Sequence, residues 1–284
     1  MESSGADALV VGESLIDIVP AADGGTAELP GGSPLNAAIG LGRLGRNVEL
    51  ATWIGQDPRG AAIQRHLAAS HVNLSQGSDQ AKRTSSARVT LDGDGKARYQ
   101  FDINWEFAPP PSIPPLLVHT GSLATAIQPG AEAVSAFIKE LRNLPGGGPT
   151  VSFDPNLRAQ FAGDLDQTVA QVEALVAASD VVKASDEDLG TLYGDVEMDE
   201  AARWWLQQGP SLVVVTCGAG GAMAFARHAE LGRRAERTKV QDTVGAGDAF
   251  TAGLLDGLWT EGLLGAAARP KLAAIDEPAL WRVL

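Results

Sequence analysis

Short runs of apolar residues alternate with longer helical patterns along most of the chain. The runs typical of buried strands are Ala8–Val11, Val48–Ile54, Leu116–His119, Thr150–Phe153, Val181–Lys183 and Leu212–Thr216. Apolar residues recur at helical spacing over Leu35–Leu44, Arg59–Ser70, Pro129–Leu141, Asp166–Ala178, Asp199–Gln208 and Ala249–Trp259. This alternation predicts βαβ units and an α/β fold, with a mostly parallel sheet that helices cover on both faces.

Two segments break this rhythm. Residues 15–28 end in a polar, glycine-rich sequence, and Ser86–Phe101 alternates around Asp92-Gly-Asp-Gly95, which is typical of a β-hairpin. The length of 284 residues suits one large domain, or one domain with a small appendage.

Charge and composition exclude several classes of function. A net charge of −13 argues against a nucleic-acid partner, which favours a basic surface. The sequence shows no secretory leader and no apolar run of membrane-spanning length, so we expect a cytoplasmic protein without a membrane partner. Cys217 is the only cysteine, and the four histidines lack metal-ligand spacing.

The stretch Asp242–Gly253 carries the most informative chemistry. Gly245 and Gly247 permit a turn in which successive N–H groups, including that of Ala246, converge on one point at the start of a helix. Helix N-termini attract anions, and the acidic Asp248 on the same turn suits a hydroxyl that must lose its proton beside a phosphate. This is the chemistry of a small-molecule kinase. Taken alone, the motif favours the simpler alternative, in which the aspartate caps the helix.

A second constellation near the N-terminus supports the kinase interpretation. It contains Gly31-Gly-Ser-Pro-Leu-Asn36, followed by Gly45 and Gly55. Both constellations resemble the diagnostic patterns of the ribokinase-like (PfkB) carbohydrate kinase family, and most closely its fructokinase-like members. Further stretches that resemble the family are residues 12–17, 153–158, 183–188 and 216–221, so the resemblance spans about residues 9–258.

The resemblance implies an ATP- and Mg²⁺-dependent sugar kinase. Residues 1–284 would form one ribokinase-like kinase domain, in which segments at about 15–30 and 86–106 make a small β-sheet lid over the sugar site. Asp248 would accept the proton of a primary hydroxyl. The N–H groups of Gly245, Ala246 and Gly247 would stabilise the charge that develops on the transferred phosphoryl group.

Candidate sugar-binding residues lie in the N-terminal half. Asp17 follows an apolar strand, and its carboxylate suits the hydroxyl groups of a sugar, although a structural salt bridge is the alternative. Gly31 and Gly32 would let a ligand approach the backbone, and the Asn36 amide can both donate and accept. In the alternative, Ser33 or Asn36 only caps the helix.

Arg158 completes the predicted sugar site. It ends the string Asp154-Pro-Asn-Leu-Arg158, which follows a buried strand, where ligands gather in open α/β sheets. Its guanidinium would contact substrate or phosphate, or else only surface acids. In fructokinase-like members this string lies close to the active site.

Nucleotide contacts are expected from the resemblance alone. The ATP ribose and phosphates would pass along the turn after the strand that ends at Thr216, and the predicted contacts are Lys183, Ser185, Thr216, Gly218 and Gly221. Where the family usually shows Asn-x-x-Glu, tied to magnesium and phosphate, this chain has Ser185 and Asp188. Asp188 is therefore the candidate metal residue, acting through water, with a solvated helix start as the alternative.

Dinucleotide binding is not expected, although Gly40–Gly45 matches G-x-G-x-x-G. These glycines fall inside a predicted helix, whereas that motif requires a strand immediately before it. Small residues there favour close packing of the helix against the sheet.

Several functions remain open. Fructose is the leading substrate, and ribose is another candidate. 2-keto-3-deoxygluconate would need a cation for its carboxylate, for which Arg88, Arg98 and Arg158 are candidates. A nucleoside ranks lower, because aromatic residues make up only 5% of the chain. A non-catalytic sugar-binding protein on the kinase fold is the alternative from another class. A homodimer that pairs two lids would bury otherwise exposed sheet edges.

Overall fold

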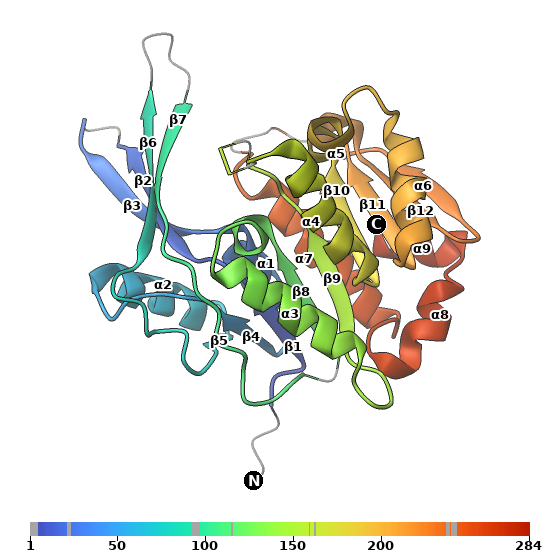
Figure 1. The fold of residues 1–284 in the computed structure, drawn as a ribbon, viewed down its shortest axis with the longest axis horizontal. Helices are drawn as coiled ribbons and strands as arrows, with labels where there is room; N and C mark the ends of the chain where they lie inside the picture. The colour runs from blue at the N-terminus through green and yellow to red at the C-terminus, as the bar shows by residue number, and fades with distance from the viewer. Residues whose placement is uncertain are drawn as a thin grey trace.

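The computed structural model describes residues 5–21, 24–91, 97–114, 116–158, 160–161, 163–236, 239 and 243–284. Its large sheet contains β1 (Ala8–Val11), β4 (Val48–Ala51), β5 (Val72–Leu74), β8 (Leu117–Gly121), β9 (Thr150–Asp154), β10 (Val181–Ser185), β11 (Leu212–Thr216), β12 (Ala222–Ala226) and β13 (Glu230–Arg233). The strand order is β13-β12-β11-β10-β9-β8-β1-β4-β5 (Figure 1). Neighbours from β11 to β5 run parallel, and β12 and β13 are antiparallel additions at one edge.

Helices cover both faces of this sheet (Figure 1). One face carries α1 (Ser33–Arg43), α2 (Pro58–Ala68), α7 (Ala246–Thr260), α8 (Arg269–Ala273) and α9 (Glu277–Val283). The other carries α3 (Gly130–Arg142), α4 (Leu165–Ala177), α5 (Asp186–Tyr193) and α6 (Met198–Gln208). Residues of β1 alternate between the two faces, because Ala8 and Val10 pack with the first group and Leu9 and Val11 pack with α3. The predicted α/β class is confirmed.

The glycines of α1 permit close packing, and the predicted packing of helix on sheet holds at Gly42, which lies against Val72 of β5, whereas Gly40 lies against α7. A Cβ placed on Gly40 would lie 2.5 Å from the Cβ of Ala252 on α7, and one on Gly42 would lie 2.3 Å from the Ser70 carbonyl oxygen. Both positions lie within a helix that begins at Ser33. Dinucleotide binding through this motif is therefore excluded by its place in the fold.

The small sheet combines β2 (Leu15–Pro20), β3 (Thr26–Gly31), β6 (Ser85–Leu91) and β7 (Ala97–Asp102). Its order is β3-β2-β6-β7, and it projects from one end of the large sheet (Figure 1). The β6–β7 hairpin is confirmed by antiparallel pairing, although its predicted turn at Asp92–Gly95 lies outside the described residues. A lid function for this sheet, and a homodimer through it, stay predictions.

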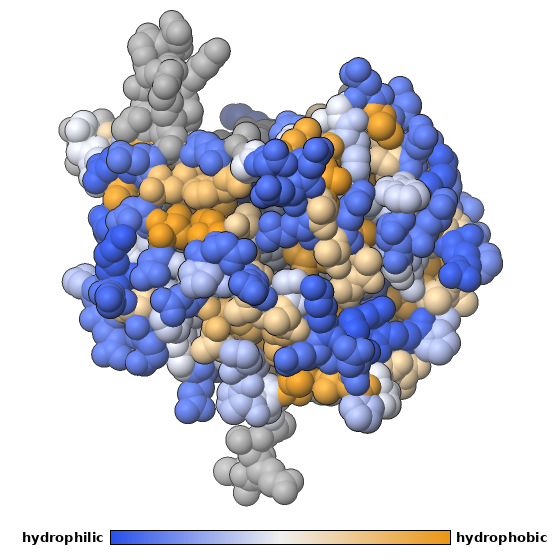
Figure 2. Space-filling model, in the orientation of Figure 1, coloured by the Kyte–Doolittle hydropathy of each residue, from blue (hydrophilic) through white to orange (hydrophobic). Residues whose placement is uncertain are grey.

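An apolar cluster joins the small sheet to the rest of the molecule. It contains Leu15, Ala87 and Leu123, with Phe101 and Phe161 packed against it. The rings of these two phenylalanines, from β7 and from the loop after β9, have centroids 5.0 Å apart. In Figure 2 the surface is largely hydrophilic, and apolar residues gather at the base of the small sheet.

Hydrogen bonds to Asp57 hold the residue that precedes β6. The Asp57 carboxylate accepts hydrogen bonds from the Gly60 N–H (2.8 Å), the Thr84 N–H (2.7 Å) and the Thr84 hydroxyl (2.8 Å). A Cβ on Gly60 would lie 1.9 Å from the Gly55 carbonyl oxygen. The spacing of Gly55, Asp57 and Gly60 therefore serves the junction between α2 and the small sheet.

Within the described residues, no helix has the length and apolar character needed to cross a membrane.

Candidate active site

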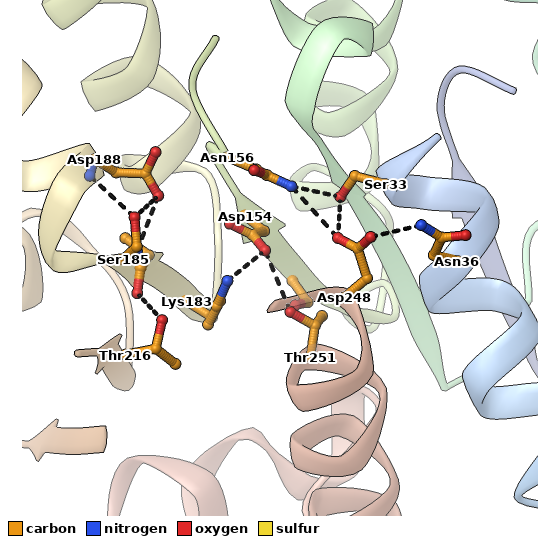
Figure 3. A network of polar contacts seen from close by, with 12 residues as sticks. Ser33, Asn36, Asp154, Asn156, Lys183, Ser185, Asp188, Thr216, Asp248 and Thr251 are labelled. Carbon is orange, nitrogen blue, oxygen red and sulfur yellow. Dashed lines mark hydrogen bonds and ion pairs between the residues drawn. The ribbon is translucent and has the colours of Figure 1, made fainter. Parts of the chain in front are cut away.

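Asp248 lies at the centre of a polar network formed by three separate segments (Figure 3). Its carboxylate, which is only 6% exposed, accepts hydrogen bonds from the Ser33 hydroxyl (2.7 Å) and the Asn36 amide (2.8 Å). The Asn156 amide lies 3.4 Å from the same carboxylate and donates to the Ser33 oxygen at 2.8 Å. These donors fix the orientation of both carboxylate oxygens.

Neither Asn36 nor Asp248 caps the helix on which it lies. The N-cap of α7 is Gly245, in a left-handed conformation with φ of 73°, and among the described residues no side chain caps this helix. The N-cap of α1 is Gly32, again without a side-chain cap in the described part of the chain. The side chains of Asn36 and Asp248 therefore bond to each other across 212 residues of sequence instead of capping their own helices.

The first turn of α7 adjoins a buried ammonium group. A Cβ placed on Gly247 would lie 3.1 Å from Lys183 Nζ, so this cation packs directly against the turn. Of the three N–H groups predicted to contact the phosphoryl group, that of Ala246 donates to the Thr243 carbonyl at 3.1 Å. The roles of Gly245 and Gly247 stay predictions, and Asp242, which opens the motif, lies outside the described residues.

Lys183 forms a buried ion pair with Asp154, which sequence reasoning did not single out. Lys183 Nζ donates to Asp154 Oδ2 at 3.0 Å, and the Thr251 hydroxyl donates to the same oxygen at 3.2 Å. Burial raises the pKa of Asp154 to about 6, although the Lys183 charge opposes this shift. Burial, followed by the Lys183 charge, lowers the pKa of the nearby His119 to about 4. The position of Asp154 at the carboxyl end of a buried strand was the signal that could have revealed it.

Asp188 is held by three donors. Its Oδ1 accepts from the Leu157 N–H at 2.7 Å, and its Oδ2 accepts from the Ser185 N–H (2.9 Å) and hydroxyl (2.7 Å). The Asp188 N–H returns a bond to the Ser185 oxygen, which completes a capping box at the start of α5. Among the described residues, no group of three or more His, Cys, Asp and Glu side chains is arranged to hold a metal ion. A water-mediated metal role for Asp188 stays a prediction.

The predicted sugar residues Asp17 and Gly31 belong to the small sheet, and Gly32 follows its strand β3. Asp17 is half-buried on β2, where burial raises its pKa and the charge of Arg158 opposes the shift. A Cβ on Gly31 would lie 2.1 Å from an Asp17 carboxylate oxygen, and one on Gly32 would lie 2.6 Å from the Glu13 carbonyl oxygen. Contacts within the chain therefore account for both glycines, and their approach to a ligand stays a prediction.

Arg158 is exposed beside Asn156. Its guanidinium donates to the Asn156 side-chain oxygen at 2.6 Å and to the Leu157 carbonyl at 3.2 Å. A pocket opens next to this loop, between η1 (Ser122–Thr125) and α4. Of the other candidate cations, Arg88 lies exposed on β6 and the side chain of Arg98 lies outside the described part.

The residues predicted to contact the nucleotide lie on β10, at the end of β11 and in the turn that follows β11. Ser185 and Thr216 are neighbours in the parallel register, and the Thr216 hydroxyl donates to the Ala184 carbonyl at 3.3 Å. Gly218 and Gly221 bound a tight turn with positive φ values of 50° and 102°. The structure thus places the predicted nucleotide residues along one edge of the sheet, with Lys183 between them and Asp248 (Figure 3).

Comparisons with known proteins agree with this arrangement. The model of the pfkB family of carbohydrate kinases matches residues 6–270. A fructokinase from Rhizobium leguminosarum bv. trifolii is 34% identical over 284 residues, which cover 96% of this chain and 85% of the relative. A fructokinase from Klebsiella pneumoniae is 32% identical, over 93% of this chain and 89% of that protein.

The chain belongs to the pfkB family of carbohydrate kinases.

A solved structure extends the comparison to three dimensions. The crystal structure of fructokinase from Vibrio cholerae O395, in a form with fructose, ADP and calcium ion bound, superposes with a TM-score of 0.78 at 31% sequence identity. The match covers 90% of this chain and 85% of that protein. The resemblance to carbohydrate kinases inferred from the sequence motifs is therefore confirmed at the level of family and fold.

Proposed function

We propose that this protein is an ATP-dependent fructokinase in which Asp248 accepts the proton of the sugar hydroxyl that attacks the γ-phosphate. The observation that carries the proposal is the buried Asp248 carboxylate, oriented by Ser33 and Asn36 at the N-terminus of α7. The fructokinases among its relatives favour fructose as the sugar.

The chain's own groups supply positioning and electrostatic stabilisation. Phosphoryl transfer needs little covalent participation by protein, so a fixed proton acceptor and fixed positive charge are the main requirements. Asp248 meets the first, because its oxygens cannot rotate without breaking hydrogen bonds. The N-terminus of α7 meets the second, and Lys183, whose ammonium group also pairs with Asp154, packs against the same turn.

A divalent cation is compatible with this site only if the nucleotide carries most of the coordination. Mg²⁺ retains several waters and needs one or two carboxylates besides phosphate oxygens. The described residues offer no three-ligand cluster, and both oxygens of Asp188 already accept hydrogen bonds. When bound with ATP, Mg²⁺ would neutralise charge on the phosphates.

A 2-keto sugar acid is the second candidate substrate. Burial raises the pKa of both Asp17 and Glu13, and the charge of the exposed Arg158 guanidinium opposes both shifts, so a cation acts on the predicted sugar side of the site. A carboxylate on the substrate would meet that charge.

A coupled ADP-release assay with magnesium-ATP tests the proposal on fructose, ribose, 2-keto-3-deoxygluconate, adenosine and glucose. We expect turnover with fructose, and we expect Asp248→Asn to lower kcat by about 10²–10⁴-fold. The matched control is Asp256→Asn on the same helix, where the carboxylate pairs with Arg46 on the surface, and turnover should stay near wild type. Near-normal turnover of Asp248→Asn would refute the catalytic assignment. Sugar binding without turnover in the wild type would favour a non-catalytic sugar-binding protein.

A further inference from the structure

We propose that Asp188 is a positioning residue of the sugar site, which acts through the loop after β9. Its carboxylate holds the Leu157 N–H, and this contact places the neighbouring Asn156 amide against Asp248. The proposal rests on the proposed function and names the residue that shapes the sugar side of the same site.

The contacts form a continuous path. Asp188 Oδ1 accepts from the Leu157 N–H at 2.7 Å, and the Asp188 side chain is buried. One residue earlier, Asn156 donates to the Ser33 hydroxyl, which in turn donates to Asp248. The side-chain oxygen of Asn156 also accepts from Arg158. The contact between Asp188 and the Leu157 N–H therefore positions both the Asn156 amide beside Asp248 and the Arg158 guanidinium.

The backbone at Asn156 explains why this loop needs an anchor. Its φ is 38°, in the left-handed region that non-glycine residues seldom adopt. Such a conformation persists only where surrounding contacts hold it. The side-chain bonds of Asn156 hold one side of the residue, and the Asp188 bond to Leu157 holds the other.

The same geometry argues against a metal role for Asp188. Its two oxygens accept three hydrogen bonds, two of them from Ser185, and the residue is only 6% exposed. An aspartate at this position is drawn back into a capping box, so its carboxylate bridges the start of α5 and the loop after β9.

The test compares Asp188→Ala with Asp188→Asn. Asparagine can turn its oxygen to the Leu157 N–H and its NH2 group to Ser185, so it keeps the loop contact and loses the charge and the acceptor for the Ser185 N–H, whereas alanine removes every one of these contacts. Asp164→Ala is the matched control, because Asp164 caps α4 through the Gln167 N–H at 3.1 Å and is exposed. Fructose affinity is measured by calorimetry without nucleotide or Mg²⁺, thermal unfolding is recorded, and turnover is titrated with Mg²⁺.

We expect Asp188→Ala to weaken fructose binding by about tenfold, the loss typical of one hydrogen bond to a charged group. Asp188→Asn should stay within about threefold of wild type, and the Mg²⁺ concentration for half-maximal turnover should not change in either variant. Asp164→Ala should lower the unfolding temperature without changing fructose affinity.

If the wild type binds and phosphorylates fructose, either of two results would overturn the proposal for Asp188 and leave the proposed function standing. One is an increased Mg²⁺ requirement in both Asp188 variants with fructose affinity unchanged, which would assign Asp188 to the metal. The other is unchanged fructose affinity and Mg²⁺ requirement with lower thermal stability, which would make Asp188 a helix cap only. Wild-type protein that neither binds nor phosphorylates any sugar of the panel would overturn the proposed function, and this proposal with it.

Discussion

Glu13 is a buried carboxyl group at the junction between the large sheet and the small sheet. It lies between β1 and β2, is 3% exposed, and accepts a hydrogen bond from the Ala124 N–H at 2.9 Å. Burial raises its pKa from 4.5 to about 7, although hydrogen bonds from Ser122 and Ala124 and the charge of Arg158 oppose the shift. The folded protein therefore binds this proton more tightly than the unfolded chain does.

The pH dependence follows from this difference. Because the folded pKa is raised, the stabilising contribution of the bound proton is fully present below pH 4.5 and is lost as the pH rises through about 7. The difference between about 7 and 4.5, at about 1.4 kcal/mol per pKa unit, corresponds to about 3 kcal/mol of unfolding free energy. At pH 8 wild type must hold a buried charge in the folded state.

Glu13→Gln removes this charge and keeps the oxygen that accepts from Ala124. We expect the variant to be more stable than wild type by about 3 kcal/mol at pH 8, with the difference vanishing near pH 4.5. Urea denaturation at pH 4.5, 6 and 8 measures both proteins, and Glu140→Gln at an exposed position of α3 is the matched control. If Glu13→Gln and wild type change in parallel across this range, or the variant is less stable at pH 8, the argument from burial is wrong.

Two further perturbations test the remaining polar networks. Burial alone would raise the pKa of Asp57, but hydrogen bonds from Gly60 and Thr84 outweigh burial and hold this pKa below its ordinary value. The ionised Asp57 therefore contributes to the unfolding free energy above about pH 4, and this contribution is lost at lower pH. Asp57→Ala should lower the unfolding free energy by about 2 kcal/mol at pH 7 and by less at pH 3, measured by urea denaturation. Lys183→Met should cost about 3–5 kcal/mol, because it leaves Asp154 buried without its cation. Adding Asp154→Asn should restore part of the thermal stability without restoring turnover; no recovery would show that the ion pair is not the cause.

The sequence predicted the fold where burial leaves a clear pattern. Strands β10 and β11 are buried on both faces, so they appear as continuous apolar runs that need no knowledge of their partners. The edge strand β13 has no buried residue and carries charged side chains, which explains why it was not predicted. The short helix α5 begins in an acidic segment, and its clearest signal was the capping box from Ser185 to Asp188.

The site was predictable where motifs mark it and unpredictable where the fold assembles it. Asp248 and Asn36 belong to motifs and were predicted, and the structure brings them within 2.8 Å. The contacts of Asn156 and Thr251 depend on three segments that meet only in the folded chain. Neither residue type identifies such a role, because amide and hydroxyl groups are common at loops and on helices.

Three aspartates, Asp154, Asp188 and Asp248, lie in the candidate site (Figure 3), and their hydrogen-bond partners distinguish their roles. Asp248 accepts hydrogen bonds from two neutral side chains, Ser33 and Asn36, whereas Asp154 pairs with the ammonium group of Lys183. Asp188 accepts from backbone N–H groups and supports a loop. The same Asp→Asn change should therefore have three different results. At Asp248 we expect loss of turnover, at Asp154 a buried Lys183 charge without its counter-ion, and at Asp188 near-normal sugar affinity. If all three substitutions abolished turnover alike with folding intact, the separate assignments would fail and the aspartates would act as one acidic unit.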